Sequence, residues 1–174
     1  MPEGDVVDYR ADLARTVRFA VARLRTVDES VAEQRPAPGK WCAKEVIGHL
    51  VDSAANNHQR FVRIRWQDDM VFPGYAQEEW VQAQDYVSAP WTELLDLWVS
   101  YNLHLARVMT GIPDEVRFRP RDRHNLAQLA WQTVPNDQPA TLDYFMADYV
   151  NHLKHHLRQI ERLGVLPGSL LPDA

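Results

Sequence analysis

Apolar residues recur every three or four positions in four long segments of the chain, a spacing typical of amphipathic helices. The pattern predicts helices over residues 5–26, 42–66, 88–111 and 141–163. Strand signals are weak, because Pro120 interrupts the one short alternating stretch, residues 117–121. Four helices of about 20 residues each indicate an all-α protein, a four-helix bundle that we expect to form one domain over residues 1–174.

Residues that favour helix ends flank these segments. Glu45 stands three residues after Cys42, where the acid of a capping box would lie, although cysteine is a poor N-cap. Ser88 is a candidate cap for the third helix, and Thr141 is a good N-cap for the fourth. Gly164 is a natural residue for the helix end that follows.

Two connections are longer than the hairpin loops of simple bundles. Residues 67–87 and 112–140 exceed the usual 2–8 residues by a wide margin. Connections of this length let the chain cross the bundle, so neighbouring helices need not be antiparallel, and they provide the rim of a pocket. A short helix is expected near residues 78–84, within the first of them.

Composition narrows the function classes. The 174 residues include 19 Lys and Arg against 24 Asp and Glu, a net charge of −5 that argues against binding nucleic acid through its phosphates. No apolar run reaches the length of about 18 residues that indicates a membrane span. Cys42 is the only cysteine, which excludes a disulfide framework. Because the first residues are polar and acidic, unlike a secretory signal, we expect a cytoplasmic protein.

The strongest chemical signal is the His152-Leu-Lys-His155-His156 run on the fourth helix. Residues four apart lie on one helix face, so His152 and His156 can converge on one ion. At about 100° per residue, His156 falls within the apolar stripe of its helix, His152 at the edge and His155 outside. We therefore expect His152 and His156 to face the bundle interior.

The second helix carries a matching polar edge near His49. Two helices with such edges would enclose a polar cavity, which is costly unless the buried groups are paired or bind a metal. Spacing alone leaves two interpretations open, a metal site or hydrogen-bonded core histidines. His58, His104 and His124 have no partner at helical spacing and are interpreted as surface or structural residues. The edge residues are Asp52, Ser53, Asn56 and Arg60 on the second helix and Asp148, His152 and Gln159 on the fourth.

These segments resemble a known family. Residues 41–53, with Asn57 and Arg60-Phe61, and residues 148–160 are similar to the second-helix and last-helix motifs of the DinB-like superfamily. The match is closest to its YfiT-like branch of metal-dependent hydrolases, which is related to bacillithiol transferases, and it covers about residues 10–163. The resemblance implies a four-helix bundle with a divalent metal on His49, His152 and His156. Cys42 departs from the family pattern, which usually has serine there.

Three neutral imidazoles suit Zn²⁺, Ni²⁺ or Fe²⁺ and leave a coordination position open. A water molecule bound in this position would act as the nucleophile of a hydrolase. A thiol bound there would act as the nucleophile of an S-transferase, which joins a low-molecular-weight thiol to an electrophile. The resemblance to the family favours the transferase. A non-enzymatic, stress-associated metal-binding bundle is the remaining alternative. The family also suggests a homodimer.

Two further groups of residues have candidate roles. Asp52 and Asp148, one turn from His49 and His152, are candidates to orient an imidazole or act as a base, with surface solvation as the alternative. Arg117, Arg119, Arg121 and Arg123 are either a solvated basic loop or a binding site for a carboxylate.

Overall fold

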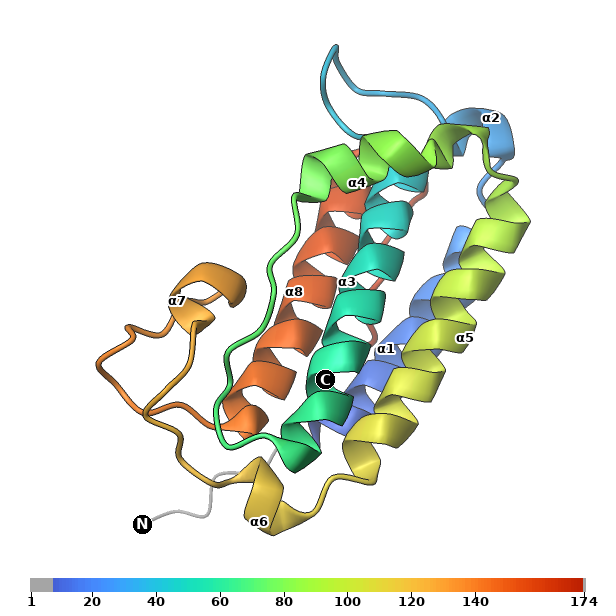
Figure 1. Cartoon of the computed structure of the whole chain (residues 1–174). Helices are drawn as coiled ribbons and strands as arrows, with labels where there is room; N and C mark the ends of the chain where they lie inside the picture. Colours follow the sequence, from blue (N-terminus) through green and yellow to red (C-terminus); the bar gives the residue numbers. More distant parts are fainter. Residues whose placement is uncertain (1–7, 174) are drawn as a thin grey trace.

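The computed structural model describes residues 8–173, and four long helices dominate it (Figure 1). They are α1 (Tyr9–Leu24), α3 (Ala43–Arg63), α5 (Trp91–Thr110) and α8 (Leu142–Arg162). All four predicted helices are confirmed within a few residues; residues 5–7 of the first prediction lie outside the described part. The shorter elements are α2 (Glu29–Ala32), η1 (Ile64–Trp66), α4 (Gln77–Gln84), η2 (Tyr86–Ser88), α6 (Asp114–Arg117) and α7 (Leu126–Leu129).

The long helices form a ring in which α1 and α3 each pack against both α5 and α8. In Figure 1, α1 and α8 run in one direction and α3 and α5 in the other, so two pairs of neighbours are parallel. This arrangement is possible because residues 67–87 return along the length of the bundle before α5 begins. The predicted crossing of the bundle by a long connection is therefore confirmed. None of the described helices combines the length and apolar character that crossing a membrane requires.

The predicted caps of α3 and α8 are confirmed. Glu45 accepts the backbone N–H of Cys42 at 2.9 Å and pairs with Arg35 at 2.6 Å. The hydroxyl of Thr141 accepts the N–H of Tyr144 at 3.1 Å. Gly164 follows α8 with a φ of +70°, a conformation that favours glycine.

The predicted cap of α5 is wrong. Ser88 instead donates its hydroxyl to Asp85 at 2.6 Å, and the helix begins after Pro90. The N–H of Trp91, which has no acceptor within its own helix, donates to the Glu29 carboxylate at 3.2 Å, a partner 62 residues away in sequence. A capping residue so distant has no local sequence signal.

The four arginines of residues 117–123 hold the connections together. Arg117 pairs with Asp143 at 2.6 Å, at the start of α8. Arg119 and Arg123 reach the 67–87 connection, where each binds an aspartate, Asp68 or Asp69, at 2.9 Å. Arg121 is buried and donates to two backbone carbonyls of its own loop at 3.1 Å. Arg119 and Arg123 are exposed, as a solvated basic loop would have them, whereas the burial of Arg117 and Arg121 contradicts that interpretation for these two residues.

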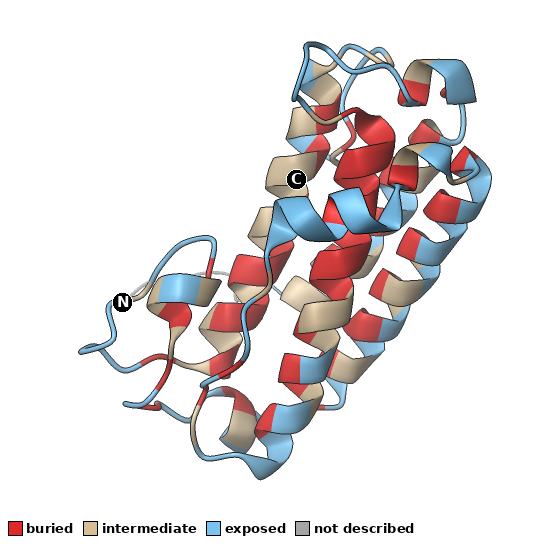
Figure 2. Cartoon of the chain, turned by 45° about the horizontal axis from the view of Figure 1, so that its top comes forward, coloured by how far each residue is buried: buried red, intermediate tan, exposed pale blue. Residues whose placement is uncertain are grey.

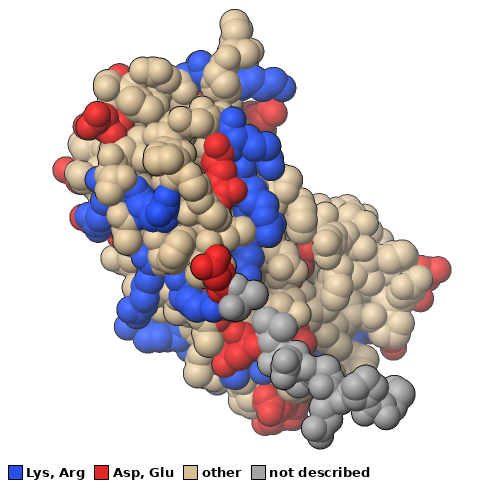
Figure 3. Space-filling model, turned by 180° about the vertical axis from the view of Figure 1, so that it is seen from behind, with Lys and Arg blue, Asp and Glu red and all other residues tan. Residues whose placement is uncertain are grey.

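Charges of both signs share the face opposite to that of Figure 1. Figure 3 shows Lys and Arg side chains lying among Asp and Glu side chains there. Lys154 of α8, for example, binds Asp12 of α1 at 2.6 Å. Such pairs connect the two parallel helices α1 and α8.

The first half of α3 is buried on all sides, including its polar residues. Every residue from Ala43 to Ala54 is buried, between α5 and α8 on the inside and α4 with η2 on the outside. Figure 2 shows α4, largely exposed, lying across this buried stretch. Gly48 makes the cover possible, because a Cβ there would lie 2.1 Å from the ring of Tyr86. The fold thus places His49, one residue later, in the interior.

We predict that Gly48→Ala destabilises the protein by about 1–3 kcal/mol, because the added methyl group displaces Tyr86. Gly111→Ala is the matched control, since its Cβ would lie 3.7 Å from the nearest atoms, and its effect should stay below about 1 kcal/mol. Chemical denaturation of the two variants and the wild type measures both. Equal stability of Gly48→Ala and the wild type would contradict the packing described here.

Candidate metal centre

Three histidines from two helices meet between α3 and α8. The Nε2 atom of His152 lies 3.4 Å from that of His49 and 3.0 Å from that of His156. One ligand atom from each of the three lies within 4.8 Å of the others. Two ligands of a tetrahedral ion with bonds of about 2.0–2.1 Å stand about 3.3 Å apart. The separations around His152 therefore fit nitrogen ligands of one shared ion.

Burial keeps these imidazoles neutral, the state that a metal requires. Burial, together with a smaller effect of the neighbouring His156, lowers the pKa of His49 to about 3 and that of His152 to about 2. Burial also lowers the pKa of His156, although its bond to Gln159 opposes the shift. All three lone pairs are thus available at neutral pH.

The orientation of His156 is fixed by the next turn of α8. Its Nδ1–H donates to the amide oxygen of Gln159 at 2.7 Å, which leaves the Nε2 lone pair directed towards His152. His49 is fully buried, and the ring of Trp41 lies 5.2 Å from its ring. Its Nδ1 has no hydrogen-bond partner among the described residues. Packing therefore orients His49, whereas a hydrogen bond orients His156.

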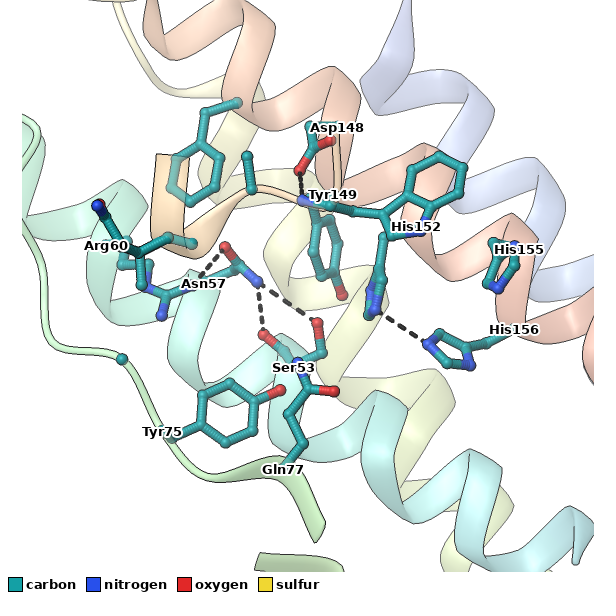
Figure 4. Close-up of a pocket in the computed structure, with 16 residues that line it drawn as sticks. Ser53, Asn57, Arg60, Tyr75, Gln77, Asp148, Tyr149, His152, His155 and His156 are labelled. Atoms are coloured by element: carbon teal, nitrogen blue, oxygen red, sulfur yellow. Dashed lines mark hydrogen bonds between the residues drawn. The ribbon is translucent and has the colours of Figure 1, made fainter. Parts of the chain in front are cut away.

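A cavity of about 360 Å³ opens beside the histidines (Figure 4). His152 and His156 contribute to its wall, and Arg60 lies towards its other end in the view of Figure 4. The connections contribute residues near Tyr75 and Trp131, as expected for a pocket rim. From α3 and α8 come Ser53, Asn57, Arg60, Phe145, Asp148, Tyr149, His152, His155 and His156.

Asp148 lines this cavity and holds one of its walls. Its two carboxylate oxygens accept the backbone N–H groups of Trp131 at 2.9 Å and Gln132 at 2.7 Å. Burial raises the pKa of Asp148, and these two N–H groups oppose the shift. The aspartate is buried and makes no hydrogen bond to His152.

Asp52 is also buried, but it does not line the cavity. One oxygen accepts from the Tyr86 hydroxyl at 2.8 Å and from Gln84 at 2.7 Å. Burial raises the pKa of Asp52, against these two donors. The residue connects α3 to the α4–η2 cover over His49. Because Asp52 and Asp148 are both buried, the alternative that they are solvated surface residues is wrong.

The other histidines divide into three cases. His124 is buried, donates to the Gln138 carbonyl at 2.7 Å and accepts the N–H of Leu126, so its structural interpretation holds. His58 and His104, far apart in sequence, meet across α3 and α5 with ring centres 5.1 Å apart. His155 lies against Trp131 at 5.1 Å and lines the cavity, a role that its position outside the apolar stripe concealed.

Comparisons with known proteins agree with this architecture. A family model described as the DinB superfamily matches residues 12–160. The chain belongs to the DinB superfamily. Among solved structures, YfiT from Bacillus subtilis is similar, with a TM-score of 0.73 at 18% identity over 94% of this chain and 91% of YfiT. That protein is described as a probable metal-dependent hydrolase with an unusual four-helix bundle topology. Comparison with curated protein sequences gives no match.

The likeness to YfiT supports the fold predicted from the DinB motifs. In this chain the bundle includes the parallel neighbours α3 and α5. The two motifs that carried the resemblance lie on α3 and α8, the helices that bring His49, His152 and His156 together.

We predict that the protein binds about one equivalent of Zn²⁺ or Ni²⁺ and that His49→Ala, His152→Ala and His156→Ala each reduce the affinity at least about tenfold, because each removes an imidazole ligand. His155→Ala is the matched control, because it removes a neighbouring histidine outside the cluster. Elemental analysis of untagged protein after dialysis against metal measures occupancy. Equal occupancy in all four variants would contradict the site.

Stability of the metal-free protein should fall as the pH falls below about 6.5, the ordinary pKa of histidine in an unfolded chain. Between this value and the lowered folded values, the unfolded chain binds more protons than the folded one, so acid favours unfolding. Each such histidine adds about 1.4 kcal/mol per pH unit to the slope of the unfolding free energy against pH. Denaturant titrations from about pH 7 to about pH 4 should show a shallower slope for His152→Gln than for the wild type. Identical slopes would show that His152 does not titrate as its burial requires.

Proposed function

We propose that this DinB protein is a metal-dependent enzyme that transfers a low-molecular-weight thiol to an electrophilic substrate. The observation that carries the proposal is the convergence of the His49, His152 and His156 Nε2 atoms beside a cavity of about 360 Å³. Three protein ligands leave a position for an exogenous group, as in catalytic sites and unlike closed structural ones.

The donor set suggests the kind of ion. Three neutral imidazoles suit Zn²⁺, Ni²⁺ or Fe²⁺, whereas Mg²⁺ and Ca²⁺ prefer oxygen ligands. Such an ion, when bound, lowers the pKa of a thiol or a water molecule and so supplies a nucleophile at neutral pH.

The chain's own residues supply the rest of the chemistry. Gln159 holds His156 in one tautomer, and Trp41 covers His49. Asp148 lines the cavity one turn from His152, and its raised pKa suits it to accept a proton from the substrate. Asp52 acts through Tyr86, which it holds against α3, and is a positioning residue in this proposal.

The thiol comes from the substrate because the protein offers none that is suitable. Cys42 is fully buried at the start of α3, and burial raises the pKa of its thiol. A buried thiol with a raised pKa is a poorer nucleophile than an exposed thiolate. The resemblance of the two histidine motifs to those of bacillithiol transferases supports an external thiol.

Hydrolysis is the second candidate. The description of YfiT as a probable metal-dependent hydrolase favours it, and the position that would take a thiol is equally open to water.

We predict that metal-loaded protein transfers glutathione, bacillithiol or mycothiol to a chlorinated aromatic electrophile. His156→Ala should reduce turnover at least about a hundredfold, and the exposed His104→Ala by less than about tenfold, because His104 belongs neither to the cluster nor to the cavity wall. Loss of the electrophile's absorbance, followed with and without thiol, measures the rate.

The alternatives give different results in the same assay. Metal-dependent cleavage of esters or amides without a thiol would replace the transferase with the hydrolase. Metal binding without either reaction would reduce the protein to a metal-binding bundle and overturn both enzymatic proposals.

A further inference from the structure

A buried arginine lies in the wall of the cavity. Arg60, in the last turns of α3, is only 6% exposed and lines the cavity with Asn57 and Ser53 (Figure 4). It donates to the Asn57 side-chain oxygen at 3.3 Å and to the Pro73 carbonyl at 3.0 Å. Both acceptors are neutral, so they orient the guanidinium without balancing its charge.

Within residues 8–173, no carboxylate lies within 4.0 Å of the Arg60 guanidinium. Arg117, which is equally buried, pairs with Asp143 at 2.6 Å. A guanidinium has about five N–H donors, of which Arg60 uses two on protein acceptors. A buried cation without a partner is costly, and a bound anion would remove that cost.

The neighbouring groups leave this charge available. Asp148 is the carboxylate in the cavity wall, but it forms no ion pair with Arg60 and binds the backbone N–H groups of residues 131 and 132. The ring of Phe145 lies under the guanidinium, 5.9 Å from it, and gives the site a flat apolar floor. Tyr75, also in the wall, has its pKa raised to about 12 by burial, so it is neutral beside Arg60.

Arg60 and the histidines lie at different ends of the cavity. His49 and Arg60 are on the same helix, and the rise of about 1.5 Å per residue separates their Cα atoms by about 16 Å along α3. In Figure 4, the histidines of α8 lie on one side of the cavity and Arg60 on the other. A ligand that contacts both is therefore elongated.

We propose that Arg60 binds a carboxylate group of the substrate, whose reacting end lies at His152 and His156. This inference rests on the proposed function for the identity of the reacting end. Arg60 takes the carboxylate through two parallel N–H···O bonds, the geometry that guanidinium favours. The substrate class is then an acid with its carboxylate at one end and its thiol or electrophilic carbon at the other. Arg60, and not the loop of residues 117–123, supplies the anion recognition.

Matched pairs of probes test the proposal. The first pair is phenylpropanoate and phenylpropanol, which carry no thiol and differ only in the carboxylate. The second is a series of aliphatic mercapto acids and the corresponding mercapto alcohols of increasing chain length. Calorimetric titration of metal-loaded protein measures the dissociation constant of each.

We expect the acid of each pair to bind wild-type protein at least about tenfold more tightly than the alcohol, because charge-assisted bonds to a buried cation are strong. In Arg60→Gln the ratio should fall to about one, and Arg60→Lys should retain part of it. Arg63→Gln is the matched control, since Arg63 is exposed on the same helix and, within the described part of the chain, bonds only to Gln59 at 3.2 Å. It should keep the wild-type ratio.

The outcomes separate the two proposals. Equal binding of acid and alcohol by the wild type overturns the role of Arg60, whether or not the Arg60 variants fold. Equal loss of acid preference in Arg63→Gln and Arg60→Gln also overturns it, because the effect would then reflect general charge. If wild-type protein binds phenylpropanoate more tightly than phenylpropanol but catalyses neither thiol transfer nor ester hydrolysis, the role of Arg60 in binding a carboxylate is supported and the proposed enzymatic function is wrong.

Discussion

Three imidazoles, one buried and two partly buried, meet between α3 and α8 and impose the constraint on which the rest of this structure depends. A polar group removed from water destabilises the fold unless it finds a partner. Here the three Nε2 atoms face one another at 3.0 and 3.4 Å around His152, a separation suited to a shared ion. Burial holds them neutral, so their lone pairs remain free for such an ion.

The surrounding architecture covers the histidines on the α4 side and leaves them open to the cavity on the other. Gly48 allows Tyr86 to approach α3, and Asp52 fixes the Tyr86 hydroxyl, so α4 and η2 cover the helix beside His49. On the other side, Asp148 binds the backbone at Trp131 and Gln132 and forms a wall of the cavity. The long connections that allow parallel neighbours in the bundle thus also build the pocket.

Features encoded by local spacing could be predicted from the sequence. The four helices follow from the apolar period, and the four-residue spacing of His152 and His156 places both on one face of α8. The third histidine, His49, came from the resemblance of its motif, since no spacing rule links α3 to α8. The two aspartates were identified as candidates, but their bonds to Tyr86 and to the backbone at residue 131 depend on tertiary contacts.

The features that sequence reasoning missed all depend on distant residues. Glu29 caps α5 across 62 positions, and Trp131 packs on His155 although the helical wheel turns His155 outward. Three arginines of residues 117–123 pair with acids on another connection and on α8, and the fourth, Arg121, is buried and donates to backbone carbonyls of its own loop. Arg60, by contrast, is in a polar line on α3, but only the fold shows that no acid among residues 8–173 pairs with it.

X-ray absorption spectroscopy of the metal-loaded protein tests the central claim most directly. We expect about three imidazole nitrogens at about 2.0–2.1 Å from a bound zinc ion, with a further light-atom ligand in the open position. Addition of a thiol should introduce one sulfur at about 2.3 Å. A shell of oxygens alone, without the imidazole scattering pattern, would contradict the assignment of His49, His152 and His156 as the metal centre.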